Sequence, residues 1–164
     1  MGSGDGRATA QVIENAKSSG VMIATAESCT GGMIAAALTD IPGASAVVER
    51  GFVTYTNAAK VQMLGVSEVT LSAHGAVSEE VAQEMATGAL TYSGAQLAVS
   101  VTGIAGPGGS EFKPEGRVCF GLATKNGVNT ETVEFGAPGR SRVRQAACDH
   151  ALALLMKALQ SPIT

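Results

Sequence analysis

Residues 21–32 read VMIATAESCTGG, and this stretch decides how the first half of the chain is expected to fold. Its first part, residues 21–26, is apolar or small and predicts a short buried strand. A turn rich in hydroxyls and glycines follows, and the small and apolar residues from Thr30 to Asp40 then predict a helix. Such a strand–turn–helix unit is a building block of α/β folds.

Helices and strands of similar kind are expected on both sides of this unit. Helices are predicted over residues 7–19, 58–64 (capped by Asn57 and ended by Gly65), 140–159, and from Ser78-Glu79-Glu80 to about Tyr92, and strands over residues 51–56, 96–102, 117–124 and 128–135. The helices between the early strands form crossovers that cover a sheet, whereas the last three strands are best joined by hairpins. We therefore predict a three-layer α/β/α sandwich around a mixed sheet.

The composition fits a single domain over residues 1–164, because 45% of the residues are hydrophobic and can form a well-buried core. A formal net charge of −3 and an aromatic share of 4% argue against a surface that binds nucleic acid. The most apolar stretch is interrupted by Glu27, Asp40 and Pro42, so we expect no membrane span. Residues 1–6 are small and polar, and we expect them to be disordered.

Three widely spaced cysteines, Cys29, Cys119 and Cys148, form no zinc-binding pattern. Unpaired thiols of this kind suit a reducing compartment. We therefore expect a cytoplasmic protein. A homo-oligomer is the expected state of so compact and apolar a domain.

Polar or glycine-rich sequence follows three of the predicted strands, in residues 25–32, 54–60 and 102–110. Ligands of open α/β sheets bind in the crevice beyond the carboxyl ends of the strands. If the three ends share one edge of the sheet, they form one pocket. The glycine-rich loop that opens at Gly103 suits contacts to phosphate or sugar through backbone amides, although flexible hairpin loops have a similar composition.

Ser28, at the junction of strand and helix, is the candidate nucleophile, and the amides of Thr30, Gly31 and Gly32 are candidate contacts to an oxyanion or a phosphate. The alternative is a capped turn with glycines for its geometry, and the local pattern alone favours this slightly. Lys60 is a candidate base if burial lowers its pKa, as in Ser-Lys hydrolases, and a solvated surface lysine otherwise.

The remaining candidates are weaker. Tyr55 is placed to relay a proton or to donate a hydrogen bond, and Cys29 is a less favoured nucleophile than Ser28 because small buried thiols often only pack. His74 and His150 are more typical of a turn and of a packed helix face than of a general base. Arg140 and Arg144 share one helical face, which favours either a phosphate clamp or a solvated basic face.

Several motifs together resemble one family. These are TAESCTGG, IPGAS, ERGFVTYTNAAKVQMLGV, HGAVSEEVAQEMA, SVTGIAGPGG and GRSRVRQAA, which cover nearly everything from about residue 8 to 158. The chain resembles the C-terminal domain of the competence/damage-inducible protein CinA, in the stand-alone form that is a nicotinamide-nucleotide amidase (NMN deamidase). In two places it departs from the family. The loop after GIAGP is a residue shorter, and KPEGRV stands where KPVGTV is usual.

The resemblance implies hydrolysis of the carboxamide of nicotinamide mononucleotide (NMN), giving nicotinate mononucleotide and ammonia, without a metal or redox cofactor. It assigns Ser28 as nucleophile, Lys60 as base and Tyr55 as its neighbour. Substrate contacts are expected from the residues Thr102, Gly103, Gly106 and Arg140. Glu27 either orients the cationic pyridinium or holds the turn by a structural hydrogen bond. Two other functions stay open, namely a nucleotide-binding or partner-binding module without catalysis, and an amidase for another small amide.

Overall fold

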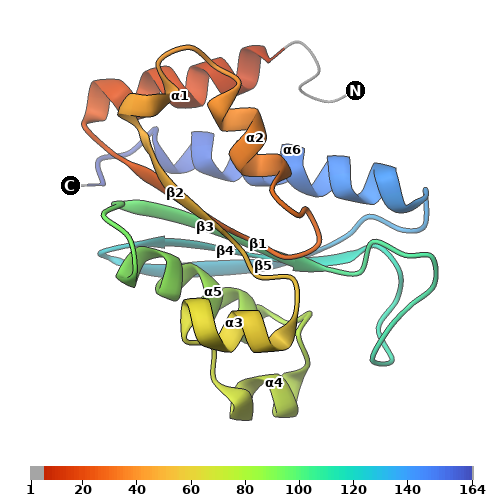
Figure 1. The fold of residues 1–164 in the computed structure, drawn as a ribbon. Coiled ribbons are helices and arrows are strands. Elements are labelled where there is room, and N and C mark those ends of the chain that lie inside the picture. The colour runs from red at the N-terminus through yellow and green to blue at the C-terminus, as the bar shows by residue number, and fades with distance from the viewer. Residues whose placement is uncertain (1–5, 164) are drawn as a thin grey trace.

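A five-stranded mixed sheet lies between two layers of helices in the computed structural model, which describes residues 6–163 (Figure 1). Its strands are β1 (Ile23–Glu27), β2 (Val48–Val53), β3 (Leu97–Gly103), β4 (Arg117–Thr124) and β5 (Gly127–Glu134). They lie in the order β2-β1-β3-β4-β5. β1 pairs in parallel with β2 and β3, whereas β4 pairs antiparallel with both β3 and β5. The predicted α/β/α sandwich around a mixed sheet is confirmed.

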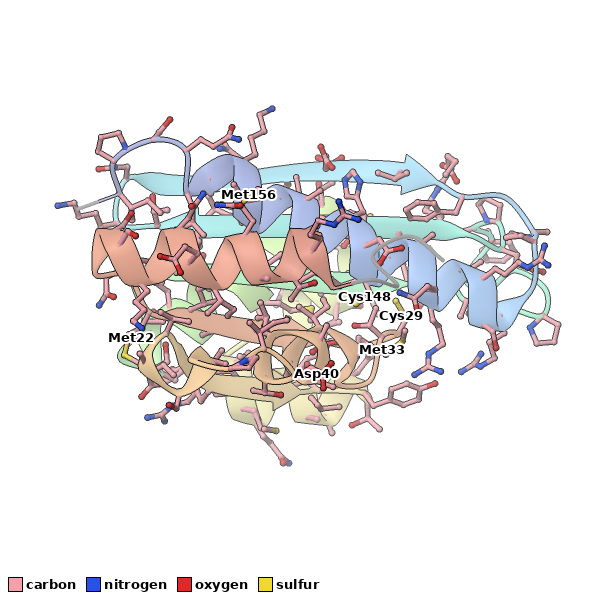
Figure 2. All side chains as sticks on the ribbon, turned by 90° about the horizontal axis from the view of Figure 1, so that it is seen from above. Met22, Cys29, Met33, Asp40, Cys148 and Met156 are labelled. Carbon is pink, nitrogen blue, oxygen red and sulfur yellow. The ribbon has the colours of Figure 1, made fainter. Side chains whose placement is uncertain are left out.

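The helices divide between the two faces of the sheet. α1 (Arg7–Ser19), α2 (Met33–Thr39) and α6 (Arg140–Ala158) cover one face, and α3 (Asn57–Leu64), α4 (Glu68–His74) and α5 (Glu79–Thr91) lie on the other (Figure 1). A short 3-10 helix, Ala44–Ala46, precedes β2. The long helices α1 and α6 run side by side across the sheet (Figure 2). Each face of the sheet is therefore covered by apolar helix surface.

Two large hydrophobic clusters fill the spaces between these layers, and a third, small cluster consists of Val77, Ala82, Ile104 and Cys119. Alternation along the strands divides their residues between the two faces of the sheet. In β1, Ile23 packs under α1 and α6, whereas its neighbours Ala24 and Ala26 pack toward α3 and α5. All five residues of β1 are buried, as expected for a central strand covered on both faces. The small side chains of β1 allow the second helical layer to approach the sheet closely.

The carboxyl ends of the three parallel strands lie at one edge of the sheet, which the sequence alone left open. Glu27 of β1 is paired with Val53 of β2 and with Val101 of β3. The amide of Ser28 donates to Val101 O at 3.0 Å, and the amide of Thr54 donates to Glu27 O at 2.9 Å. The polar segments after these strands therefore meet at one place.

Two element boundaries differ from the prediction. The strand predicted over residues 51–56 is β2, Val48–Val53, which begins and ends three residues earlier. The chain leaves the sheet there because β1, its partner strand among the described residues, ends at Glu27. The helix predicted from Thr30 begins at Met33, since Gly31 and Gly32 have φ values of 55° and 105°, which an α-helix cannot include.

Two features of the second helical layer also differ. The cap of α3 is Thr56, whose hydroxyl accepts from the amide of Ala59 at 3.0 Å, and not Asn57 as predicted. α4 was not predicted because it buries none of its residues and so has no apolar face to reveal it. Ser67 caps it through the amides of Val69 and Thr70, and this serine followed by Glu68 is the local signal that marks its start.

The remaining expectations concern the amino-terminal segment and membranes. The disorder expected for residues 1–6 falls, for residues 1–5, outside the part of the chain that the structure describes. Gly6 precedes α1, and its carbonyl accepts from the amide of Ala10 at 2.9 Å. Within the described part of the chain, no helix has the length and hydropathy needed to cross a bilayer.

Candidate active site

A cleft of about 340 Å³ lies at the edge where the parallel strands end. Three segments form most of its walls, namely the Ser28–Cys29 turn, residues 55–60 and the glycine-rich loop 102–111. Ala76 and Val77 close one side, and Arg140 of α6 stands at another. The cleft therefore joins the three segments that the sequence indicated, and its volume is in the range usual for small-molecule sites.

Ser28 is the first residue after β1 and points into this cleft. Its backbone amide is fixed to β3, and only 8% of the residue is exposed. Among the cleft residues its hydroxyl is the one in contact with the amine of Lys60, at 3.2 Å. A hydroxyl held beside a potential base is the arrangement that a serine nucleophile needs.

Lys60 lies in the first turn of α3 and is 1% exposed, which is rare for a lysine. Its Nζ donates to the carbonyl of Thr54 at 3.1 Å and to the carbonyl of Tyr55 at 3.3 Å. A carbonyl can only accept, so two N–H bonds of the amine are directed at these oxygens. The remaining tetrahedral position of Nζ is directed at Ser28 Oγ.

The surroundings of Lys60 favour its neutral form. Burial removes the ammonium from water and lowers its pKa from 10.5, against smaller raising effects of Cys29 and Glu111. No carboxylate within residues 6–163 forms an ion pair with Lys60, because the hydrogen bonds of Nζ go to two carbonyls and a hydroxyl. A neutral amine with both N–H groups bound has its lone pair free to accept the proton of Ser28.

Tyr55 contributes two different groups to the site. Its backbone carbonyl holds Lys60, whereas its phenolic oxygen accepts from Arg140 Nη2 at 2.9 Å. The residue is 57% exposed and lines the cleft. Tyr55, the predicted neighbour of Lys60, therefore contacts Lys60 through its backbone carbonyl, whereas its hydroxyl contacts Arg140.

Arg140 bridges two walls of the cleft. Its Nη1 donates to the carbonyl of Gly106 at 2.6 Å, in addition to the bond to Tyr55. It opens α6, one helical turn before Arg144. A guanidinium that lines a cleft and is held by two neutral acceptors keeps its full positive charge, so it remains available to an anion.

Glycine is required at two positions of the glycine-rich loop, and a threonine at its start joins it to the rest of the cleft. A methyl group at position 103 would lie 2.7 Å from Val118 Cγ2 and 3.0 Å from Cys29 Sγ, so Gly103 lets the loop approach β4 and the nucleophile turn. Gly106 has a φ of 93°, which favours glycine. Thr102 is buried and donates its hydroxyl to Ala76 O at 2.8 Å, which joins the loop to the opposite wall.

Three predicted substrate contacts, Thr30, Gly31 and Gly32, are not among the residues that line the cleft. The hydroxyl of Thr30 donates to Glu27 Oε1 at 2.5 Å, and the amide of Gly32 donates to the same oxygen at 3.2 Å. The amide of Gly31 closes the turn on Ser28 O. These residues shape the turn, and the cleft wall here is made by Ser28 and Cys29.

Glu27, which the sequence left between two roles, has a structural one. It is fully buried, and its carboxylate also accepts from the amides of Ile34 at 3.0 Å and Ala35 at 2.9 Å. The negative charge thereby satisfies the first amides of α2 at the positive end of its dipole. With both oxygens occupied and no surface exposed, Glu27 is not available to a substrate cation.

Replacement of Glu27 by glutamine is expected to destabilise the protein by about 1–3 kcal/mol, because an NH₂ group then faces a buried amide donor. The free energy of unfolding in urea measures this loss. Glu14→Gln on the exposed face of α1 is the matched control and should leave stability unchanged. A stability of Glu27→Gln equal to that of the control would show that the carboxylate does not hold the turn.

The surroundings of Cys29, which lines the cleft, and the positions of the two histidines do not favour a catalytic role. Burial raises the pKa of the Cys29 thiol to about 12, and Cys29 shares a core cluster with Cys148, toward which it lies under α6 (Figure 2). His74 ends α4, and His150 pairs with Glu131 beside the ring of Phe120. Neither histidine lines the cleft.

Sequence reasoning missed two polar cleft residues, Asn57 and Glu111, and the apolar pair Ala76 and Val77. Glu111 lies in the glycine-rich loop with a φ of 53°, and no local pattern distinguished it from other polar loop residues. Nearby, Lys113 pins this loop to the carbonyls of His74 at 2.6 Å and Val77 at 2.5 Å. Within residues 6–163 no cluster of three or more His, Cys, Asp or Glu side chains could hold a metal ion.

Several known proteins are similar to this chain in sequence and in fold. Nicotinamide-nucleotide amidohydrolase PncC of Escherichia coli (strain K12) is 53% identical over 146 residues, which cover 88% of this chain and 88% of that protein. A CinA-like protein of Chlorobium phaeobacteroides (strain BS1) is 55% identical over 147 residues, or 87% of this chain. The chain spans 26% to 36% of the length of three longer relatives that it matches.

The structural comparison agrees. The crystal structure of the competence/damage inducible protein CihA from Agrobacterium tumefaciens superposes with a TM-score of 0.91 at 50% identity, covering 95% of each chain. The family model of the CinA C-terminal domain matches residues 6–159, which is nearly the whole chain. The resemblance inferred from the motifs is confirmed, and the chain belongs to the CinA C-terminal domain family.

Proposed function

We propose that this chain is a nicotinamide-nucleotide amidohydrolase that converts NMN and water to nicotinate mononucleotide and ammonia through a serine nucleophile and a lysine base. The observation that carries the proposal is the buried amine of Lys60, 3.2 Å from Ser28 Oγ with its other donors on two carbonyls. The name of the 53% identical E. coli relative supports the substrate.

The first half of the reaction forms an acyl-enzyme. Ser28 Oγ bonds to the carboxamide carbon, its proton passes to Lys60 Nζ, and the carbonyl electrons move to the oxygen. The tetrahedral intermediate then collapses. The C–N bond breaks, and the leaving nitrogen takes the proton from Lys60 and departs as ammonia.

The second half returns the enzyme to its starting state. Water attacks the ester while Lys60 accepts one of its protons, the bond from carbon to Ser28 Oγ breaks, and the serine oxygen recovers a proton from Lys60. The nicotinate carboxylate is released. Because one amine serves as base and acid in both halves, its pKa must lie near the working pH, in the direction in which burial moves it.

The charges around the cleft suit the two charged ends of NMN. Arg140 at the mouth is the proposed partner of the phosphate, and Glu111 in the glycine-rich loop is the proposed partner of the cationic pyridinium. Glu111 replaces Glu27 in this role because the carboxylate of Glu27 is buried and fully bonded. Thr102, Gly103 and Gly106, which line the same cleft, are the proposed contacts to the rest of the substrate.

The deciding experiment is ammonia release by the wild-type protein from NMN and from a panel of nicotinamide, nicotinamide riboside, glutamine and asparagine. Formation of nicotinate mononucleotide, followed by chromatography, is the expected result. Binding of NMN without turnover would favour the module without catalysis. Turnover of another amide in preference to NMN would identify an amidase of different specificity.

Arg140→Met is expected to raise the KM for NMN by about 10- to 100-fold, because a charge-assisted hydrogen bond to phosphate contributes about 1.5–3 kcal/mol. Nicotinamide riboside, which lacks the phosphate, should react equally with the variant and the wild type. Arg142→Met on an exposed face of α6 is the matched control. Equal losses for NMN and riboside would assign Arg140 to loop structure and not to the phosphate.

We also propose a cytoplasmic location and a homo-oligomeric state. The location is supported by three buried cysteines that are all free thiols, as a reducing compartment keeps them. The oligomer is supported by exposed apolar side chains, among them Val53 at 46% and Val69 at 77%. Analytical ultracentrifugation would test the oligomer, and a monomer at micromolar concentration would contradict it.

A further inference from the structure

The strand β3 continues past the end of its parallel neighbour β1. The last pair of the ladder between them is Glu27 with Val101, whereas β3 runs on to Gly103. Just beyond that pair, the amide of Ser28 donates to Val101 O at 3.0 Å. Acceptors and donors alternate along the edge of a strand in a parallel ladder, so the next group on this edge is the N–H of Gly103.

The antiparallel ladder on the other side of β3 gives the same direction for this N–H. Gly103 lies opposite Val118 of β4, and the amide of the next residue, Ile104, donates to Arg117 O at 2.9 Å. Hydrogen-bonded and non-hydrogen-bonded pairs alternate along an antiparallel ladder. Because Ile104 bonds toward β4, the N–H of Gly103 points away from β4, toward the turn of Ser28.

The acceptor that would complete the parallel ladder is engaged elsewhere. If β1 continued as a strand, the carbonyl of Ser28 would accept from the amide of Gly103. The chain turns into α2 instead, and Ser28 O accepts from the amide of Gly31 at 3.0 Å. Within residues 6–163 the Gly103 amide donates to no protein atom. Main-chain donors without a partner are uncommon in folded proteins, so a free one at a cleft points to an acceptor on a ligand.

This amide belongs to the same cleft as the proposed nucleophile and base. Gly103, Ser28 and Lys60 all line it. The backbone of Gly103 also lies close to the residue after the nucleophile, because a methyl group at position 103 would be 3.0 Å from Cys29 Sγ. The free donor is therefore beside the place where Ser28 attacks.

We infer that the backbone amide of Gly103 donates to the oxyanion that forms when Ser28 attacks the carboxamide. The oxyanion then occupies the position that a carbonyl of β1 would hold in a longer ladder. The inference rests on the serine mechanism proposed above and makes the contact proposed for Gly103 specific. Pairing on both sides of β3 fixes the direction of this N–H before substrate binds, so the donor needs no reorganisation as the charge develops.

The test replaces the amide of Gly103 by an ester, through translation with a tRNA charged with glycolic acid. This change removes the N–H and adds no side chain. Loss of one oxyanion donor typically costs about 10²- to 10³-fold in kcat, so we expect kcat for NMN to fall about 10²-fold with KM unchanged. The matched control is an ester at Val101, whose amide belongs to the β1–β3 ladder and which is not among the residues that line the cleft. The control should unfold at lower urea concentration and keep the kcat of the wild type.

Two further readouts separate the loss of a donor from a rearranged site. The rate of labelling of Ser28 by a fluorophosphonate probe should fall in parallel with kcat, because negative charge also develops on the phosphoryl oxygen. This readout does not require NMN to be the substrate. The rise of kcat/KM with pH should keep its apparent pKa, because the amide is uncharged and the hydrogen bonds of Lys60 go to other groups.

Each outcome distinguishes this inference from the proposed function. A wild-type protein that is labelled at Ser28 but does not hydrolyse NMN would overturn the proposed function, while slower labelling of the Gly103 ester would still support the inference. A wild-type kcat and labelling rate in the Gly103 ester would overturn the inference alone. Equal losses of kcat in the two esters, or a shifted apparent pKa, would assign the effect to strand structure and would also overturn it. Absence of labelling in the wild type would overturn both.

Discussion

Ser28→Ala is expected to lower kcat for ammonia release from NMN by about 10⁵- to 10⁶-fold, the loss seen when a hydrolase loses its nucleophile. Binding of NMN should persist, because the charged groups proposed to hold the substrate, Arg140 and Glu111, are unchanged. Deletion of one hydroxyl from a residue that is 8% exposed should also leave the fold intact. The variant is thus expected to be a folded protein that binds substrate without turning it over.

The measurement is single-turnover ammonia release together with calorimetric binding of NMN. Ser141→Ala, an exposed serine beside Arg140, is the matched control and should keep full activity. Mass spectrometry of the quenched wild type should find the acyl group on Ser28 and not on Cys29, whose thiol has a raised pKa. Residual activity within tenfold of the wild type would contradict the serine mechanism.

The sequence predicted the fold well wherever local pattern and tertiary environment agree. The strand that ends in TAES and the loop after residue 102 were located correctly because buried strands and glycine-rich turns leave strong local signals. The end of β2 was misplaced by three residues, since its partner in the sheet and not its own side chains decides where the strand stops. Edge strands are the elements for which such shifts are most expected.

The site was predictable only in part, for a similar reason. Ser28 and Lys60 are separated by 32 positions, and their contact follows from the parallel pairing of β1 with β2, which topology rules anticipate. The roles of Thr30 and Glu27 depend on which hydrogen-bond partners the folded turn offers. Arg144 also donates to two carbonyls of this turn, 115 and 114 positions away, and no local pattern indicates such a contact.

Lys60→Met is expected to lower kcat by about 10²- to 10⁴-fold, the usual contribution of a general base. Methionine fills a similar volume but cannot accept the proton of Ser28. In the wild type, kcat/KM should rise with pH as Lys60 loses its proton, with an apparent pKa below 10.5 because burial disfavours the ammonium. The rise of kcat/KM with pH should be missing from Lys60→Met. If the variant still shows this rise, Lys60 is not the base.

The same substitution should change how stability depends on pH. The pKa of Lys60 is lower in the folded protein than the 10.5 of an ordinary lysine. Between these two values the unfolded chain binds more protons at this position than the folded protein does. The free energy of unfolding therefore rises with pH across this interval in the wild type, and Lys60→Met lacks this contribution.

The lost carbonyl partners of Lys60→Met add a cost that does not vary with pH, so the informative quantity is the slope of the stability difference between wild type and variant. Urea unfolding of both proteins should be measured from pH 6 to 10. The free energy of unfolding of the wild type, relative to that of the variant, should increase as pH rises, by about 1.4 kcal/mol for each unit by which the pKa of Lys60 is lowered. Lys125→Met, an exposed lysine at the opposite end of the sheet, should run parallel to the wild type. A constant difference would mean that Lys60 titrates as an ordinary lysine, and the lone pair that the mechanism requires would then be absent at neutral pH.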